Sequence, residues 1–373
     1  MNESPSARWV VVGNRENRRI GLFLDAARAA GVAAPRVVEW RAVLRDGGHD
    51  FAEDEIVRLD SPGENPAVDE LLRGVNDPTR VEGSARWYAR FLDAVGSLRG
   101  GRRLDDPAEL AVLFDKRLCH ARLDGAGVPV PASPTSGAEA PVGGWSEVRD
   151  RLRDNGLRRV FVKLAHGSSA SGVLAIESTS SGRWRATTSV EVAADGLHNS
   201  LEVRRYSSEP EIAAIVDRLA PDGLHIEQWV PKASLAGRTA DLRVLVVAGR
   251  ATHAVVRTSR APMTNLHLGG TRGDLAAVRV AAGDRWTEAL AICEQAAACF
   301  PGTLCVGVDL LPSIGWRRFT IGEVNAFGDL LPRLTGLPEG PAAGVDTYTA
   351  QLRAAPYFVA PQLDSPEVRY APA

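Results

Sequence analysis

The segments TLCVGVDLL (residues 303–311) and FTIGEVN (residues 319–325) decide the fold of this protein. Each is short, apolar and bounded by polar or turn-forming residues, which is typical of a buried strand. The residues between them, PSIGWRR, include Pro, Ser and Gly, which favour a tight reversal of the chain. The pattern therefore predicts an antiparallel hairpin whose turn is centred near Gly315.

This hairpin carries three oxygen-bearing side chains among apolar neighbours. Glu323 and Asn325 lie two residues apart, so they face the same side of their strand. A turn near Gly315 places Asp309 opposite Ile321 to Glu323, which lets all three side chains converge. Mg²⁺ prefers such oxygen ligands and completes its shell with phosphates and water. The alternative is that the carboxylates pair with nearby arginines.

A lysine at a strand end precedes a loop of glycine and serine. Lys163 lies near the end of the apolar run FVKLA, and the loop HGSSASG follows at residues 166–172. The lysine charge can hold a phosphate while backbone N–H groups and the hydroxyls of Ser168 and Ser169 cradle its oxygens. The loop is not a Walker A motif, because the lysine precedes the glycines. The alternative is a strand-end lysine that reaches toward solvent.

A second hairpin is indicated by DLRVLVV, the turn AGRA and the return segment THAVVRT. Asp241 and Arg243 share one face of the first strand, and Arg257 lies on the return strand. The loop NLHLGG then adds Asn265 and His267. Arginine can bind phosphate or carboxylate oxygens in a bidentate way. An ion pair across the strands and a structural or surface histidine are the alternatives.

Residues 106–126 predict two short helices. Asp106 begins the first, and Asp115 is a favourable N-cap for the second, which Lys116 opens. By itself, this pattern indicates a solvent-exposed helix lysine. The stretch 128–144 is rich in Pro, Gly and Ser, which predicts a linker that leads to a new unit.

The N-terminal region predicts a parallel sheet. RWVVVG (8–13) and RVVEW (36–40) are short apolar strands, and a segment with helical spacing of apolar residues separates them. This arrangement is a βαβ unit with a right-handed crossover. The first strand ends in GNREN rather than GxGxxG, so the fingerprint of a nicotinamide-dependent dehydrogenase is missing.

Composition excludes several classes of protein. A chain of 373 residues predicts two or three domains. Its 44 Lys and Arg against 46 Asp and Glu give a net charge of −2, which provides no general attraction to nucleic acid or anionic lipid. Neither a signal peptide nor a membrane span is indicated, and the spacings of the four cysteines fit no zinc site. We therefore expect a cytoplasmic protein with reduced thiols and with neither nucleic-acid nor membrane partners.

In order and spacing, the segments above resemble the ATP-grasp superfamily, and within it the RimK-type ribosomal-protein glutamate ligases and related peptide ligases. The resemblance covers the chain from Asp115 to about Thr349. It rests on the segments DKRLCHARLDGAGVPVP, FVKLAHGSSASGV, IEQWV, DLRVLVVAGRATHAVVR, NLHLGG, GVDLL and GEVNAFGDL. Each segment is a weak signal alone, whereas their joint order is specific.

The resemblance implies an α/β fold that is α+β in its ATP-grasp part. Residues 1–105 would form a Rossmann-like pre-ATP-grasp domain. Residues 106–230 would form the small lobe with its preceding helical linker, and residues 231–356 the C-terminal lobe. Residues 357–373 would be a Pro-rich tail that wraps or frays.

The resemblance also implies the roles of individual residues. Lys116 and Lys163 would contact the phosphates of ATP, and the serines of the loop would assist. The hinge would offer backbone groups to the edge of adenine from Glu227, Gln228 and Val230. One or two Mg²⁺ ions would be held by Asp309, Glu323 and Asn325. Arg257, together with Arg243, would act on the transferred phosphoryl group, and the substrate side would be shaped by Asp241, Arg243, Asn265 and His267.

The implied activity is ATP-dependent joining of a carboxylate to an amine through an acyl phosphate. The partners would be a small-molecule or peptide carboxylate and an amine, and a homodimer is expected by analogy. A small-molecule kinase on the same fold and a nucleotide-binding module without turnover are the alternatives. The loop after GEVN reads AFGDL, which departs from the usual family turn, so a RimK-like acceptor does not follow. RLDSPGEN (58–65) is a candidate substrate loop through Arg58, Ser61 and Glu64, or an ordinary turn.

Overall fold

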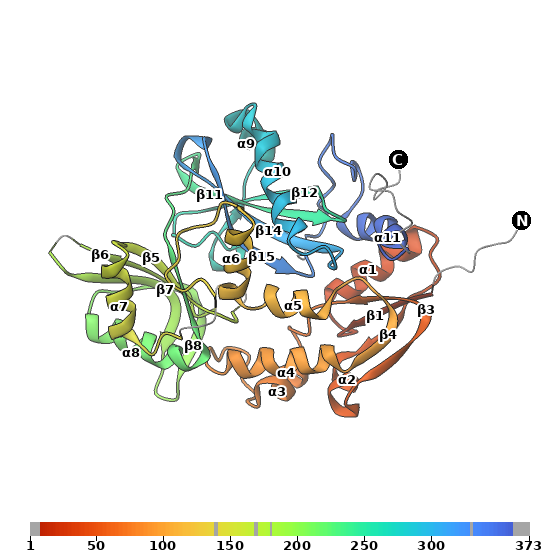
Figure 1. The fold of residues 1–373 in the computed structure, drawn as a ribbon, viewed down its shortest axis with the longest axis horizontal. Coiled ribbons are helices and arrows are strands. Elements are labelled where there is room, and N and C mark those ends of the chain that lie inside the picture. Colours follow the sequence, from red (N-terminus) through yellow and green to blue (C-terminus); the bar gives the residue numbers. More distant parts are fainter. Residues whose placement is uncertain (1–7, 138–140, 168–170, 180, 329–330, 361–373) are drawn as a thin grey trace, which may run out of the picture.

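The computed structural model describes residues 8–137, 141–167, 171–179, 181–328 and 331–360. Three β-sheets form its framework, and the helices lie around and between them (Figure 1). We call them the N-terminal, middle and C-terminal sheets. Within the described ranges, no helix is both long and apolar enough to cross a bilayer.

The N-terminal sheet is parallel, as the sequence predicts, with strand order β2-β1-β3-β4. Its strands are β1 (Arg8–Gly13), β2 (Arg36–Glu39), β3 (His49–Leu59) and β4 (Leu98–Arg103). The accompanying helices are α1 (Arg18–Ala29), α2 (Trp40–Asp46), α3 (Pro66–Arg73) and α4 (Ser84–Gly96). The Asn17 side chain caps α1 by accepting from the N–H of Arg19, and Gly31 follows the helix with φ 68°. This left-handed conformation suits glycine, which has no Cβ atom.

The middle sheet is antiparallel, with strand order β8-β7-β6-β5-β9. Its strands are β5 (Arg159–Leu164), β6 (Leu174–Ser178), β7 (Trp184–Val192), β8 (Leu197–Tyr206) and β9 (Leu224–Gln228). One face is covered by α7 (Trp145–Asp154), α8 (Glu209–Leu219) and the short helix η1 (Ala220–Asp222). Strand β9, from the end of this region, returns to pair with β5 and so brings distant residues beside Lys163.

The C-terminal sheet has strand order β13-β12-β11-β14-β15, and β10 pairs with β11. Its strands are β10 (Ser234–Leu235), β11 (Arg238–Val247), β12 (Arg250–Ser259), β13 (Thr271–Arg272), β14 (Cys305–Pro312) and β15 (Phe319–Ala326). Its helices are η2 (Leu266–Leu268), α9 (Leu275–Ala282), α10 (Arg285–Ala298) and η3 (Ile314–Trp316). Both predicted hairpins are present: Ala248 and Gly249 form a two-residue turn with positive φ at both positions, which matches the twist of paired strands.

Two helices connect the N-terminal region to the sheets. Helices α5 (Pro107–Leu113) and α6 (Lys116–Gly125) are capped by the side chains of Asp106 and Asp115, as predicted. Their apolar residues pack into the core of the C-terminal sheet beside β15 rather than onto the middle sheet. The sequence grouped these helices with the small lobe, and the domain boundaries themselves stay a prediction.

The last helix, α11 (Thr347–Phe358), returns to the N-terminal region and lies beside α1 (Figure 1). The ring of Tyr348 meets that of Phe23 edge-on, with centroids 6.0 Å apart. The helix includes the first two residues of the expected tail, 357 and 358, and residues 361–373 lie outside the described ranges. All four cysteines carry free thiols, as expected, and three of them are buried.

Candidate active site

The β14–β15 hairpin brings Asp309 and Glu323 together. Their Cα positions are paired in the register, directly before an irregularity at Leu310, and Gly315 occupies the turn with φ 76°. Asn325 is paired with Gly307 and donates from Nδ2 to its carbonyl oxygen at 3.3 Å. The register predicted from the sequence is therefore confirmed, and the three side chains share one region of the sheet.

Asp309 is held by two arginines of the neighbouring hairpin. Arg243 Nε donates to Asp309 Oδ1 at 2.5 Å, and Arg257 Nη2 lies 3.1 Å from Asp309 Oδ2. Both arginines come from strands β11 and β12, whose register places Arg257 opposite Asp241. Pairing with arginine, which the sequence left open as an alternative to metal binding, is thus realised at Asp309.

Asp241 lies at the centre of a second ion-pair cluster and is almost fully buried. Arg257 Nε donates to Asp241 Oδ1 at 2.8 Å, and Lys232 Nζ lies 2.9 Å from Oδ2. The hydroxyl of Thr264 donates to the same Oδ2 atom. Burial alone would raise the pKa of Asp241, but the charges of Arg257 and Lys232 hold it far below its usual range. Asp241 therefore orients Arg257, and both of its oxygens are engaged within the protein.

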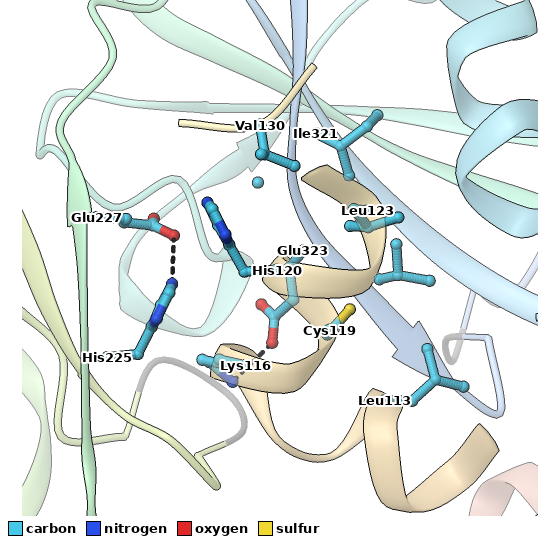
Figure 2. Close-up of a pocket in the computed structure, with 12 residues that line it drawn as sticks. Leu113, Lys116, Cys119, His120, Leu123, Val130, His225, Glu227, Ile321 and Glu323 are labelled. Atoms are coloured by element: carbon cyan, nitrogen blue, oxygen red, sulfur yellow. Dashed lines mark ion pairs between the residues drawn. The ribbon is translucent and has the colours of Figure 1, made fainter. Parts of the chain in front are cut away.

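Glu323 pairs with the lysine at the start of α6. Lys116 Nζ lies 2.8 Å from Glu323 Oε1 and donates to the carbonyl oxygen of Gly167 at 2.5 Å (Figure 2). Burial would raise the pKa of Glu323, but the nearby charges of Lys116 and Lys163 lower it. Lys116 is thus not a solvated helix lysine: it joins the hairpin to the first residues of loop 166–172.

Lys163 points toward the same region from β5. Its ammonium forms an ion pair with Glu227 on β9. The other oxygen of this carboxylate, Glu227 Oε2, lies 3.6 Å from His225 Nε2, a contact drawn in Figure 2. Burial raises the pKa of Glu227, but Lys163 and His225 outweigh this effect and lower it to about 2. Burial also lowers the pKa of His225, so this imidazole is neutral at pH 7.

The side chains of Lys116, His225, Glu227 and Glu323 border a small pocket between α6, β9 and β15 that is partly open to solvent (Figure 2). Its apolar wall consists of Leu113, Leu123, Val130, Ile321 and Val324. Its polar wall consists of Lys116, His120, His225, Glu227 and Glu323. A pocket with apolar walls and a few convergent charges is the usual form of a small-molecule site.

The predicted hinge is partly engaged within the protein. The N–H of Gln228 donates to the carbonyl oxygen of Ala132 at 2.8 Å, and that of Trp229 donates to Arg159 at 2.9 Å. Both groups are therefore taken, and Glu227 faces the lysine with its side chain. The contact between this segment and adenine stays a prediction, now restricted to the remaining backbone groups, including those of Val230.

Ser168 and Ser169 lie outside the described residues, and so does the side chain of His267. Asn265 precedes η2, and its backbone carbonyl accepts from the N–H groups of Leu268 and Gly270. The roles of these four residues stay predictions.

The sequence did not single out Lys232, Thr264 or His225. Lys232 comes shortly after the strand segment LHIEQWV, and Lys163 comes directly after the apolar residues VFV. This similarity is a weak signal for a second lysine at the end of a strand. Thr264 precedes the quoted segment NLHLGG by one residue. No sequence pattern indicated the partner of Lys232 and Thr264, because Asp241 meets them through tertiary pairing, whereas His225 lies two residues before Glu227 on β9 and shares its strand face.

The site as a whole carries a small positive charge. Five cations, Lys116, Lys163, Lys232, Arg243 and Arg257, surround four carboxylates, those of Glu227, Asp241, Asp309 and Glu323, which leaves 5 − 4 = +1. A site of this charge attracts a polyanion, and a divalent cation bound here would have to replace or share the cations that now pair with the carboxylates.

The donor set fits Mg²⁺ with partial coordination by the protein. Asp309, Glu323 and Asn325 offer two carboxylates and one amide oxygen, which are ligands that Mg²⁺ accepts. In the part of the chain that the structure describes, no group of three or more His, Cys, Asp or Glu residues is placed to hold a metal ion. Phosphate and water oxygens would have to complete the shell, as they commonly do for Mg²⁺.

Comparison with known proteins supports the fold. No family model matches the chain, and no curated protein matches it. Among solved structures, D-cycloserine synthetase DcsG is 17% identical with a TM-score of 0.56, over 94% of this chain and 99% of that one. The chain has the ATP-grasp fold.

The ATP-grasp ligase PsnB shows the same likeness in two complexes. With a minimal precursor it is 14% identical, and with a phosphomimetic precursor variant, Mg and ADP it is 15% identical. In both cases the TM-score is 0.52, over 95% of this chain and 99% of that one. The α/β ATP-grasp architecture expected from the sequence is thus confirmed, whereas the RimK type stays a prediction.

The interpretation of RLDSPGEN as a substrate loop is wrong at Arg58, because this side chain is not open to a substrate. Its guanidinium is buried, donates to Asp60 Oδ2 at 2.7 Å and to Gln351 Oε1 at 3.2 Å, and lies over the ring of Phe23. The alternation of β3 turns Arg58 toward α11 rather than toward solvent. The sequence could not anticipate this, because Gln351 lies almost 300 residues away along the chain.

The rest of RLDSPGEN forms a capping turn. The Oγ of Ser61 accepts from the N–H of Gly63, and Asn65 caps α3 by accepting from the N–H of Val68. Glu64 adopts φ 62° and is exposed. These contacts are those of an ordinary turn, and a substrate role for residues 61–65 stays a prediction.

A buried carboxyl next to Arg58 predicts a pH effect on stability. Burial raises the pKa of Asp105 to about 7, although the Arg58 charge and the Leu59 N–H group lower it. Because the folded pKa exceeds the unfolded value of about 3.8, Asp105 stabilises the fold most below pH 4, and this contribution is lost as pH rises toward 7. We expect Asp105→Asn, which keeps an acceptor for Leu59, to be more stable than wild type at pH 8, by up to about 4 kcal/mol.

Urea unfolding at pH 5, 6, 7 and 8 measures this effect. The difference between Asp105→Asn and wild type should grow up to about pH 7 and then stay constant. Asp25→Asn, an exposed helix position, serves as the matched control. Parallel pH profiles for wild type and Asp105→Asn would contradict the assignment.

Proposed function

We propose that this chain is an ATP-dependent ligase that joins a carboxylate to an amine. In the first step the carboxylate attacks the γ-phosphorus of ATP, which yields an acyl phosphate and ADP. The amine then attacks the acyl carbon, so that an amide forms and phosphate leaves. The observation that carries the proposal is the cluster of ion pairs in which Asp309, Glu323 and five cations lie together beside an apolar pocket.

The proposed roles follow the geometry. Lys116 and Lys163 would bind the phosphates, and Arg257, aimed by Asp241, would balance charge on the transferred phosphoryl group. Mg²⁺ held by Asp309, Glu323 and Asn325 would neutralise phosphate charge. Catalysis would then consist of positioning and charge balance, and no nucleophilic side chain is needed.

The proposal also covers the partners and the compartment. PsnB is a ligase solved with a minimal precursor, and DcsG is a D-cycloserine synthetase, and we take both a peptide and a small molecule as candidate substrates. A cytoplasmic location is supported by the four free thiols and by the need for ATP. A homodimer remains part of the proposal by analogy alone.

Thermal unfolding with and without Mg·ATP tests the function. At about 100 times its dissociation constant, a ligand of the folded state stabilises it by about 2.7 kcal/mol. We expect this shift in wild type, its loss with EDTA, and its loss or reduction in Glu323→Ala, which removes a carboxylate from the hairpin. Glu202→Ala, on the exposed face of β8, should respond as wild type does. No shift in wild type with any nucleotide would refute the ligase.

A further inference from the structure

The segment between β12 and β13, residues 260–270, contacts both the middle sheet and the ion-pair cluster around Asp241. It leaves the C-terminal sheet after Ser259 and returns to it at Thr271. Two neighbouring residues in it, Met263 and Thr264, are buried in different surroundings. Gly270 is required at its end, because a Cβ there would lie only 2.6 Å from the carbonyl oxygen of Asn265. The segment is therefore a compact loop with a defined shape.

One side of the loop packs on the middle sheet. Met263 and Leu268 form an apolar cluster with Val173 and Ala175, and Phe161, Val203 and Trp229 border it. Val173 is the first residue after loop 166–172, and Phe161 lies on β5 two residues before Lys163. Met263 thus touches the part of the middle sheet that carries the predicted phosphate-binding groups.

The other side of the loop reaches the ion-pair cluster of Arg257. Thr264 donates its hydroxyl to Asp241 Oδ2 and accepts from Lys232 Nζ at 3.0 Å. Asp241 Oδ1 in turn accepts from Arg257 Nε at 2.8 Å. Because the two oxygens belong to one carboxylate, this carboxylate links Thr264 to Arg257.

We propose that this loop couples the position of the middle sheet to the aim of Arg257. Met263 and Thr264 are its positioning residues: neither touches the phosphoryl group, and each acts through a neighbour. In this coupling, a shift of the middle sheet moves Met263, and Thr264 sets the Asp241 carboxylate that directs Arg257. The inference rests on the proposed function only in that Arg257 contacts the terminal phosphate.

The affinities for Mg·AMPPNP and Mg·ADP, measured by calorimetry, separate this role from a structural one. Only AMPPNP carries a γ-phosphate for Arg257, so the ratio of the two affinities reports whether Arg257 is oriented toward that phosphate. We expect wild type to prefer AMPPNP, and Arg257→Leu to lose that preference. Thr264→Val should reduce the preference for AMPPNP about three- to tenfold, which corresponds to the net free energy of one buried hydrogen bond. Thr264→Ser should retain it.

Control variants distinguish a loss of folding from a change in the orientation of Arg257. Thr258→Val removes a buried hydroxyl at the end of β12, two residues before the loop, where it bonds Thr271 and Arg238 but not Asp241, and should leave the ratio unchanged. Met263→Ala should lower the ratio although Asp241 keeps all its partners, while Met263→Leu, which conserves volume, should not. A change in melting temperature alone, without a change in the ratio, overturns the inference.

The outcomes distinguish the inference from the function on which it rests. If wild type binds neither nucleotide, the proposed function fails. If it binds both and Thr264→Val or Met263→Ala keeps the wild-type ratio, the coupling fails while the nucleotide site stands. If wild type binds both equally, the coupling also fails, because no γ-phosphate contact exists for Arg257 to make.

Discussion

Asp241→Asn is expected to lower the free energy of unfolding by about 3–5 kcal/mol, the usual cost of breaking a buried ion pair on one side. The carboxylate is 2% exposed and accepts from Arg257, Lys232 and Thr264. Asparagine removes the negative charge and turns an N–H₂ group toward these donors, so Lys232 loses its counter-charge and Arg257 keeps only its ion pair with Asp309. Urea unfolding followed by circular dichroism and tryptophan fluorescence measures the loss.

A second substitution tests this explanation. Asp241→Asn combined with Lys232→Met removes one of the stranded cations and should recover part of the lost stability. Asp54→Asn, at an exposed pair with Arg8, should leave the unfolding curve unchanged. A loss below about 1 kcal/mol in Asp241→Asn would show that water reaches the cluster and screens it.

Lys163→Met is expected to have the second large effect, on both stability and nucleotide binding. The side chain keeps its apolar stem but leaves Glu227, which is 4% exposed, with only His225 beside it. We expect the free energy of unfolding at pH 7 to fall by about 3–5 kcal/mol. Binding of Mg·ADP should be lost, because the charge that faces the cleft is gone.

The pH dependence of this loss has a defined sign. The pKa of Glu227 is lowered to about 2 in the folded chain, so its stabilising effect is present above the unfolded value of about 4.5. It is lost as pH falls from about 4.5 to about 2. In Lys163→Met this part of the acid unfolding profile should flatten, because the partner that lowers the pKa is absent.

The double variant Lys163→Met/Glu227→Gln separates the structural role of the pair from its role in binding. A neutral amide in place of the stranded carboxylate should restore most of the stability, since both charges are then removed together. Binding of Mg·ADP should not return. A double variant that binds the nucleotide as wild type does would show that Lys163 is a structural lysine and not a phosphate ligand.

The sequence by itself determined the local elements and their pairing. Alternation along GVDLL and IGEVN, with a turn near Gly315, was enough to place Asp309 opposite Ile321 to Glu323, a range that includes its partner in the structure, Glu323. Asp106 and Asp115 marked the starts of α5 and α6 because a side-chain oxygen there bonds free N–H groups of the first turn. Such features depend on residues a few positions apart, which is why they can be predicted from the chain alone.

Only the tertiary structure decided which charges meet. Lys163 faces Glu227 because β9 returns to pair with β5, and Arg58 is buried because α11 folds back onto α1. Lys232 and Thr264 reach Asp241 from separate segments. An ion pair between distant segments leaves no periodicity in the sequence, because any lysine can meet any carboxylate until packing fixes their separation and removes the water between them.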